Sequence, residues 1–174
     1  MNPRTTFVHI QAYPHGLVEP SLLLWLTDHG FSPGNIYIGG VGHRGIVSGF
    51  NEMIRVALSS PFDTFLFAER DIRPNTAGHN TEPFLNELGG DIVCATYPCG
   101  NSHAWDHTDA FHTGLWRTTR AAMLKIQPPW FTNDYADPMH IRPAGCECAS
   151  FARKAIAAGL KIVRSGEADH TPSH

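Results

Sequence analysis

The chain has 174 residues, of which 42% are hydrophobic and 17% are charged. This length and composition suit one globular domain and exclude a disordered or collagen-like chain. The formal net charge of −3 argues against a sequence-independent attraction to nucleic acid.

The apolar runs are short. The best of them, Leu22 to Leu26, has a quarter of the ~20 residues that a membrane-spanning helix needs. The start, Met1-Asn2-Pro3-Arg4, lacks the apolar stretch of a secretory signal. We therefore expect a single domain over residues 1–174 that is cytoplasmic and has no membrane span.

Strands alternate with helices along the chain. Near-continuous apolar runs rich in β-branched and aromatic residues predict the strands, and apolar spacings of three and four predict the helices. In chain order we expect a strand at 5–11, a helix at 21–30, a strand at 35–38, a helix at 46–58, a strand at 63–68, a helix at 82–88, a strand at 91–96, a short helix or edge element at 117–126, a helix at 148–159 and a strand at 160–163. Such alternation is typical of an α/β fold with a mostly parallel sheet.

Two acidic residues follow the most apolar of these strands. Glu69 and Asp71 come at its carboxyl end, where open α/β sheets bind their ligands. Residues two apart in an extended chain point the same way, so both carboxylates could hold one hard divalent cation. The alternative is a charged, solvated turn, which has the same spacing.

Other candidate residues lie at element boundaries. Asn51 near the start of the second helix, with Arg44 before it, could contact a base. Gly114 stands among aromatic and hydroxyl side chains, which suits the close approach of a sugar ring or an ordinary buried turn. Glu147 lies at a helix start, where the helix dipole keeps a carboxylate ionised, although capping alone would explain it.

The order of these segments resembles that of GT-A fold glycosyltransferases, in particular the family 2-like nucleotide-sugar transferases. Residues 65–74 are similar to their strand and Asp-x-Asp signature, with Glu69 and Asp71 at the two acidic positions. Residues 11–14 are similar to the loop that holds the nucleoside, and residues 145–155 to the helix with their Glu-Asp pair. The segments 111–117 and 128–131 resemble those beside the sugar and acceptor pocket, and His170 takes the place of a carboxyl-terminal metal ligand.

The resemblance implies a Rossmann-like GT-A fold and a metal-dependent transfer of a sugar, with a UDP-sugar as donor, to an acceptor hydroxyl. It implies a Mn2+ or Mg2+ ion held by Glu69, Asp71 and His170, and an inverting reaction with Glu147 as the base. The acceptor could be a glycan, a protein, a small molecule or a modified nucleobase, and a homo-oligomer could complete its platform. The residues implied to contact the donor are Ala12, Tyr13, Pro14, Arg44, Asn51, Glu69, Arg70, Gly114 and Trp116.

Several alternatives stay open. The family's Glu-Asp pair is Glu147-Cys148 here, so a non-catalytic nucleotide- or sugar-binding module is the main one. The polar-aromatic loop with His103, His107 and His112 could bind the acceptor or a second metal, but such histidines are more often ordinary surface groups. A histidine-based hydrolase is disfavoured because no His-x-Glu-x-x-His spacing occurs. The four cysteines lack the C-x2-C spacing of zinc sites, which favours reduced, buried thiols.

Overall fold

The computed structural model describes residues 1–12, 17–39, 45–97, 111–132, 134–135, 143–145 and 147–170. Two short 3-10 helices occupy Pro3–Thr5 and Pro33–Asn35. The other elements are, in order, β1 (Thr6–Gln11), α1 (Pro20–Asp28), β2 (Ile36–Gly39), α2 (Ile46–Ser59), β3 (Thr64–Glu69), β4 (Ile72–Pro74), α3 (Glu82–Asn86), β5 (Ile92–Thr96), β6 (Leu115–Thr119), α4 (Arg120–Met123), β7 (Asp134–Tyr135), β8 (Pro143–Gly145), α5 (Glu147–Ala157) and β9 (Ile162–His170).

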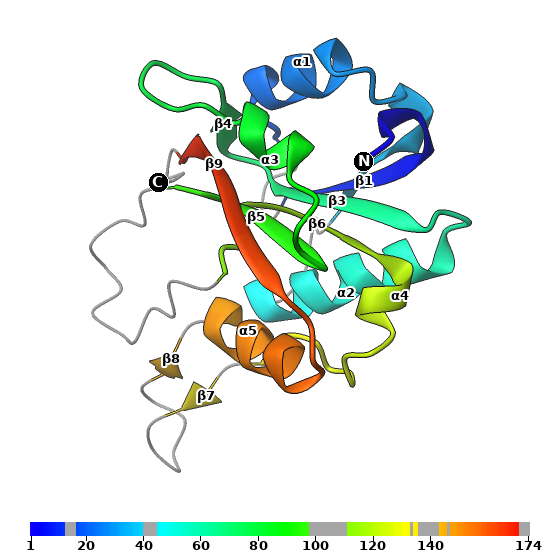
Figure 1. Cartoon of the computed structure of the whole chain (residues 1–174), viewed down its shortest axis with the longest axis vertical. Helices are drawn as coiled ribbons and strands as arrows, with labels where there is room; N and C mark the ends of the chain where they lie inside the picture. The colour runs from blue at the N-terminus through cyan, green and yellow to red at the C-terminus, as the bar shows by residue number, and fades with distance from the viewer. Residues whose placement is uncertain are drawn as a thin grey trace.

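A seven-stranded sheet of order β2-β1-β3-β6-β5-β9-β4 organises the described chain, and β7 and β8 form a separate small sheet (Figure 1). The pairs β1–β2, β1–β3 and β5–β9 are parallel, whereas β3–β6, β5–β6 and β4–β9 are antiparallel. The predicted α/β class is confirmed. The sheet is mixed rather than mostly parallel, because β6 and β4 run antiparallel to the strands beside them.

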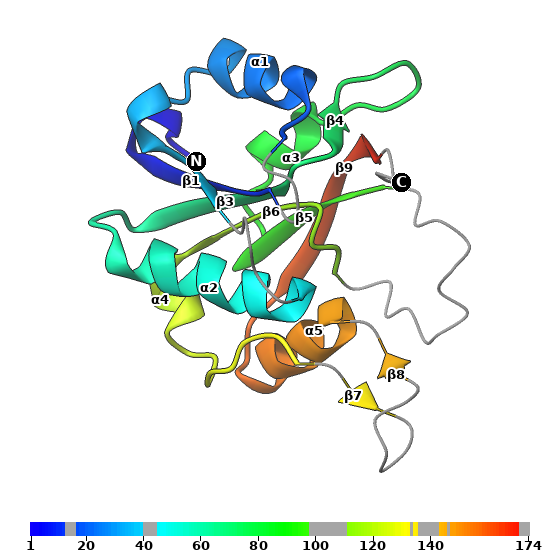
Figure 2. The ribbon, with the colours of Figure 1, turned by 180° about the vertical axis from the view of Figure 1, so that it is seen from behind.

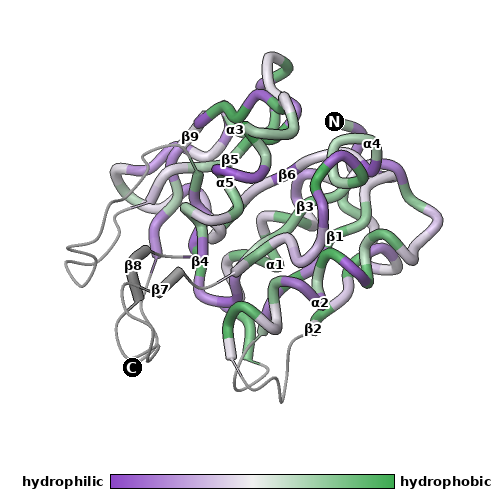
Figure 3. Tube along the Cα trace, turned by 90° about the horizontal axis from the view of Figure 1, so that it is seen from below, coloured by the Kyte–Doolittle hydropathy of each residue, from purple (hydrophilic) through white to green (hydrophobic). Residues whose placement is uncertain are grey.

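Helices cover both faces of this sheet. Helices α1 and α3 lie on one face, and α2, α4 and α5 lie on the other (Figures 1 and 2). Alternate residues of one strand therefore enter different cores: Val8 and Ile10 pack on the side of α1, and Phe7 packs on the side of α2. This double burial explains the near-continuous apolar strands in the sequence. Along α2, polar and apolar residues alternate because only one side of the helix meets the sheet (Figure 3).

Strand β6 lies in the middle of the sheet, where the sequence predicted a turn followed by a short helix or edge element. Its central residue, Arg117, interrupts the apolar run by which a buried strand is recognised in a sequence. The Arg117 guanidinium lies over the Phe84 ring and donates to the main-chain carbonyls of Phe84 and Glu87. A charged side chain can occupy this strand because α3 supplies acceptors for it.

Strand β9 is longer than the 160–163 predicted for it and reaches His170. Its second half is polar, so the apolar run ends too early to reveal its length. Pairing with β5 and, antiparallel, with β4 supports this half, and Ile72 pairs directly with His170. The extension therefore brings the end of β9 beside the turn that follows β3.

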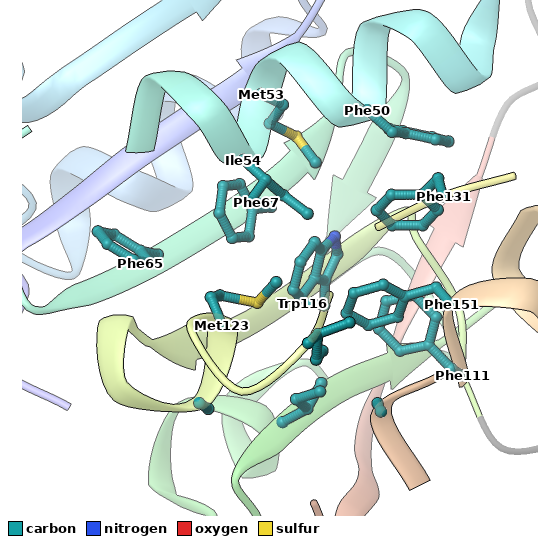
Figure 4. Packing of buried hydrophobic residues seen from close by; sticks show 14 of the residues in the cluster. Phe50, Met53, Ile54, Phe65, Phe67, Phe111, Trp116, Met123, Phe131 and Phe151 are labelled. Carbon is teal, nitrogen blue, oxygen red and sulfur yellow. The ribbon is translucent and has the colours of Figure 1, made fainter. Parts of the chain in front are cut away.

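Trp116, which the sequence placed against the donor, lies instead in the centre of the larger core (Figure 4). The side chain is fully buried, and its ring centroid is 4.3 Å from that of Phe67 and 5.2 Å from those of Phe111 and Phe151. The aromatic ring therefore serves packing and has no exposed face for a sugar.

Replacement of this core ring is expected to destabilise the protein. Trp116→Ala should lower the free energy of unfolding by about 3–5 kcal/mol, because the ring's contacts are lost and a cavity is left. Urea unfolding followed by circular dichroism measures the change, and Leu124→Ala, at a side chain that is 66% exposed, is the control. A Trp116→Ala variant that is as stable as the wild type but binds nucleotide poorly would contradict the packing role and favour a contact with the donor.

Candidate metal centre

Three potential metal ligands converge where β3 and β9 end. Glu69 is the last residue of β3, Asp71 lies in the following turn, and His170 is the last residue of β9. The His170 Nε2 atom lies 3.3 Å from Asp71 Oδ1 and 3.8 Å from Glu69 Oε2. One ligand atom from each residue lies within 4.8 Å of the others, and each side chain is 17% or 18% exposed. The predicted grouping of these residues is thus present in the structure.

Main-chain hydrogen bonds fix the turn that carries the two carboxylates. The Glu69 amide donates to the Gly114 carbonyl at 2.8 Å, and the Arg70 amide donates to the Gln11 carbonyl at 3.1 Å. The Arg70 carbonyl accepts from the Glu19 amide at 2.7 Å. Because three separate segments hold the turn, both carboxylates start from a rigid backbone.

The charges of the three side chains are coupled. The hydrogen bond that His170 donates to Asp71, and then the one it donates to Glu69, raises the pKa of His170 from its usual 6.5 to about 10. Burial alone would raise the pKa of Asp71, but the hydrogen bond and charge of His170 outweigh it and the pKa is lowered. Without a cation, a protonated His170 therefore offsets part of the negative charge of the carboxylates.

This coupling predicts a pH-dependent stability of the metal-free protein. Because the folded-state pKa of His170 is raised, its contribution is complete below pH 6.5 and is lost as the pH rises through about 10. The free energy of unfolding should fall across this window. Mn2+ affinity should rise across it, since the metal takes the place of the proton.

Urea unfolding of the metal-free protein between pH 6 and about 10 measures this effect. His170→Asn should lose the decline, and His79→Asn, at another histidine of the described chain, should keep it. An identical decline in wild type and His170→Asn would contradict the assigned coupling.

A threonine hydroxyl contacts Glu69, and a cysteine thiol contacts that hydroxyl. Thr113 Oγ1 donates to Glu69 Oε1 at 2.5 Å and lies 3.4 Å from Cys148 Sγ. Cys148 is the second residue of α5, so this contact brings the start of that helix, with Glu147, to the carboxylate edge. The start of α5 is therefore linked through Thr113 to Glu69, one of the three potential metal ligands.

An aromatic ring and a pocket border the centre. The Tyr97 ring centroid lies 4.9 Å from both the His112 and the His170 rings. Tyr97 also lines a pocket of about 260 Å³ with His79, Thr96 and Glu167. A ligand in this pocket would lie one aromatic side chain away from His170.

Gly114 and Ala12, two of the residues implied to contact the donor, lie where the sheet meets the turn after β3. A Cβ atom on Gly114 would come within 2.4 Å of the Tyr97 ring and 2.7 Å of Ile72, so glycine permits this close packing. Ala12 is fully buried at the end of β1, and its amide donates to Gly39. Both positions shape the backbone of the site.

Asn51 has a structural role in place of the predicted contact with a base. Its amide group donates to the carbonyls of Val47 and Phe131, and its oxygen accepts from the Phe131 amide. These bonds tie α2 to the segment that leads to α5. The polar atoms of Asn51 are thus already engaged by the protein.

Some predictions concern residues outside the described ranges: Tyr13, Pro14 and Arg44 of the donor contacts, His103 and His107 of the polar loop, and Cys99 and Cys146 of the possible zinc pairs. Within the described part of the chain, neither Cys94 nor Cys148 forms a disulfide, and burial raises the pKa of Cys94 to about 11. Cys94 is buried, as expected for these cysteines, whereas Cys148 is only partly buried.

Gln11 begins the segment 11–14 that resembles the nucleoside-holding loop, but it is not among the donor contacts that the resemblance implies. Gln11 is paired in register with Glu69 and is 4% exposed. Among the described residues, neither its amide nitrogen nor its amide oxygen has a hydrogen-bond partner. A buried amide without a partner is costly, so a ligand that supplies both a donor and an acceptor would stabilise it.

Comparison with family models and with curated proteins gives no match. Among solved structures, A197 from STIV is similar, with 17% sequence identity and a TM-score of 0.64. The similarity covers 97% of this chain and 86% of A197. Among the described helices, none is both long and apolar enough to cross a membrane. At this level of identity, the comparison establishes that the chain shares its fold with A197 from STIV.

Proposed function

We propose that this protein is a metal-dependent glycosyltransferase that moves a sugar from a nucleotide-sugar, with UDP as its nucleotide, to an acceptor hydroxyl. The observation that carries the proposal is the convergence of Glu69, Asp71 and His170 at the end of β3. Carboxylates placed there could hold a cation against a diphosphate, which is the chemistry that departure of a sugar from a nucleotide requires.

The three side chains fit a first-row divalent cation. Two carboxylates and one imidazole supply two oxygen ligands and one nitrogen ligand from Glu69, Asp71 and His170. Imidazole favours Mn2+ over Mg2+, which prefers oxygen alone. When bound, such a cation neutralises the charge that develops on the diphosphate leaving group.

The sheet supports a Rossmann-like GT-A arrangement. Strands β2, β1, β3, β5 and β9 share one direction, so the carboxyl ends of β1, β3 and β9 lie at the same edge. The unpartnered amide of Gln11 lies at this edge beside Glu69. An amide matches the paired donor and acceptor of a pyrimidine edge, which supports a nucleotide as the ligand.

Glu147 is proposed as the base of an inverting displacement. The contacts of Thr113 with Glu69 and with Cys148 link the start of α5 to the cation site, which supports this role for Glu147. The positive end of the helix keeps the Glu147 carboxylate ionised and able to take the proton of the acceptor hydroxyl. The pocket beside Tyr97 offers a place for an acceptor outside the cation site.

Titration calorimetry with UDP, with and without Mn2+, tests the nucleotide and metal together. An assay for UDP release from UDP-sugars, over a panel of sugar, peptide and small-molecule acceptors, then tests transfer. We expect Mn2+-dependent binding and release of UDP. Binding without turnover would favour the non-catalytic module, and an absence of Mn2+-dependent UDP binding would contradict the proposal.

A further inference from the structure

The Thr113 hydroxyl connects three elements of the site. It lies 2.5 Å from the Glu69 carboxylate at the end of β3 and 3.4 Å from the Cys148 thiol at the start of α5. Thr113 itself precedes β6 and is only 3% exposed. Bulk water therefore competes little with either contact.

The direction of both hydrogen bonds follows from counting protons. An ionised carboxylate can only accept, so Thr113 gives its single hydroxyl proton to Glu69 Oε1. The Thr113 oxygen must then accept from Cys148, whose S–H is the remaining donor of the pair. The result is a directed chain from the thiol through the hydroxyl to the carboxylate.

This chain leaves the second oxygen of Glu69 for another partner. Oε1 accepts from Thr113, whereas Oε2 is the oxygen that faces His170, at 3.8 Å. Without the hydroxyl, the Glu69 carboxylate could rotate and turn either oxygen away from His170 and Asp71. The hydrogen bond thus fixes which oxygen points to the other metal ligands.

The backbone keeps Thr113 in register with Glu69. The carbonyl of the next residue, Gly114, accepts from the Glu69 amide at 2.8 Å, so the same two segments meet through both main chain and side chain. Gly114 is in turn packed against the Tyr97 ring. These contacts therefore fix the position of the Thr113 hydroxyl relative to the Glu69 carboxylate.

We propose that Thr113 and Cys148 are positioning residues that orient Glu69 for a divalent cation and link the start of α5 to the metal centre. This inference rests on the cation of the proposed function but not on its nucleotide or its reaction. It also assigns a role to Cys148, the residue that replaces the second acidic position of the resembled family. A neutral S–H donor supports Glu69, where a carboxylate would repel it.

The affinity for Mn2+ alone, measured from the electron paramagnetic resonance signal of the free ion, tests this proposal. Thr113→Val has nearly the same shape without the hydroxyl and should weaken Mn2+ binding roughly 10- to 100-fold, as expected for the loss of an outer partner of a metal ligand. Thr113→Ser should restore most of the affinity. Cys148→Ala should weaken binding about two- to tenfold, the equivalent of one ordinary hydrogen bond, and Cys148→Ser should recover it.

Thr118→Val is the matched control, since Thr118 is also a buried threonine of this segment and its hydroxyl donates to the Asp91 carbonyl, away from the centre. It should leave Mn2+ affinity unchanged, and melting temperatures of the metal-free variants report any general damage. The Cys148 pair keeps the test decisive if Thr113→Val does not fold.

The outcomes separate the two proposals. Equal Mn2+ affinity in wild type, Thr113→Val and Cys148→Ala would overturn the positioning role while leaving the proposed function intact. Mn2+ binding that depends on Thr113, in a protein that binds no nucleotide, would support the positioning role and overturn the function. A wild-type protein that binds no Mn2+ would overturn both.

Discussion

Asp71→Ala should abolish Mn2+-dependent UDP binding and lower the rate of sugar transfer roughly 1000-fold or more. The expected loss is large because a charged metal ligand contributes several kcal/mol of charge stabilisation in the transition state. Asp71 is also the closer of the two carboxylates to His170, at 3.3 Å. Its removal therefore breaks the metal centre and not only one contact within it. Titration calorimetry and the UDP-release assay measure both effects.

Two further variants make the Asp71 result specific. Asp71→Asn retains an oxygen but loses the charge, and should recover only a small part of the Mn2+ affinity. Asp169→Ala removes a neighbouring acidic side chain that pairs with Arg73 at 2.8 Å, and should bind Mn2+ and UDP as the wild type does. Wild-type turnover in Asp71→Ala would contradict the claim that transfer requires a cation held by Asp71.

Glu147→Gln should leave Mn2+ and UDP binding nearly unchanged and reduce kcat by about 10²- to 10⁴-fold, the usual contribution of a general base. The amide keeps the size and hydrogen-bonding reach of the side chain at the start of α5 but cannot take a proton. The loss should therefore appear in transfer and not in donor affinity. Single-turnover release of UDP in the presence of acceptor measures the chemical step directly.

Glu87→Gln, at the end of α3 on the other face of the sheet, is a matched control and should transfer at the wild-type rate. Equal turnover in wild type and Glu147→Gln would end the assignment of Glu147 as the base. Mn2+-dependent UDP binding in both proteins, with no transfer by either to any acceptor tested, would favour a binding module.

The strands that are buried on both faces could be predicted from the sequence, because their side chains are apolar on both sides. Strand β3 follows this pattern, with Phe65, Leu66, Phe67 and Ala68 all buried. Strand β6 could not be predicted in this way, since Arg117 at its centre depends on carbonyls that α3 provides. The end of β9 was hidden for a related reason: its polar residues are held by pairing with β4 and β5 and not by burial.

The acidic part of the site could also be predicted, since Glu69 and Asp71 stand directly after a buried strand. Asn51 and Trp116 were misplaced because the sequence does not tell whether a polar or aromatic side chain turns toward a ligand or toward the protein. Thr113 was missed because a threonine beside a glycine has no local signal of its contact with Glu69. That contact exists only once β3 and β6 are paired.

Anomalous diffraction at the manganese edge, from crystals soaked with MnCl2 and UDP, tests the central claim most directly. The account predicts a single strong peak bounded by Glu69, Asp71 and His170, with the diphosphate on its open side. A peak elsewhere, or UDP bound with these three side chains still hydrogen-bonded to one another, would contradict it.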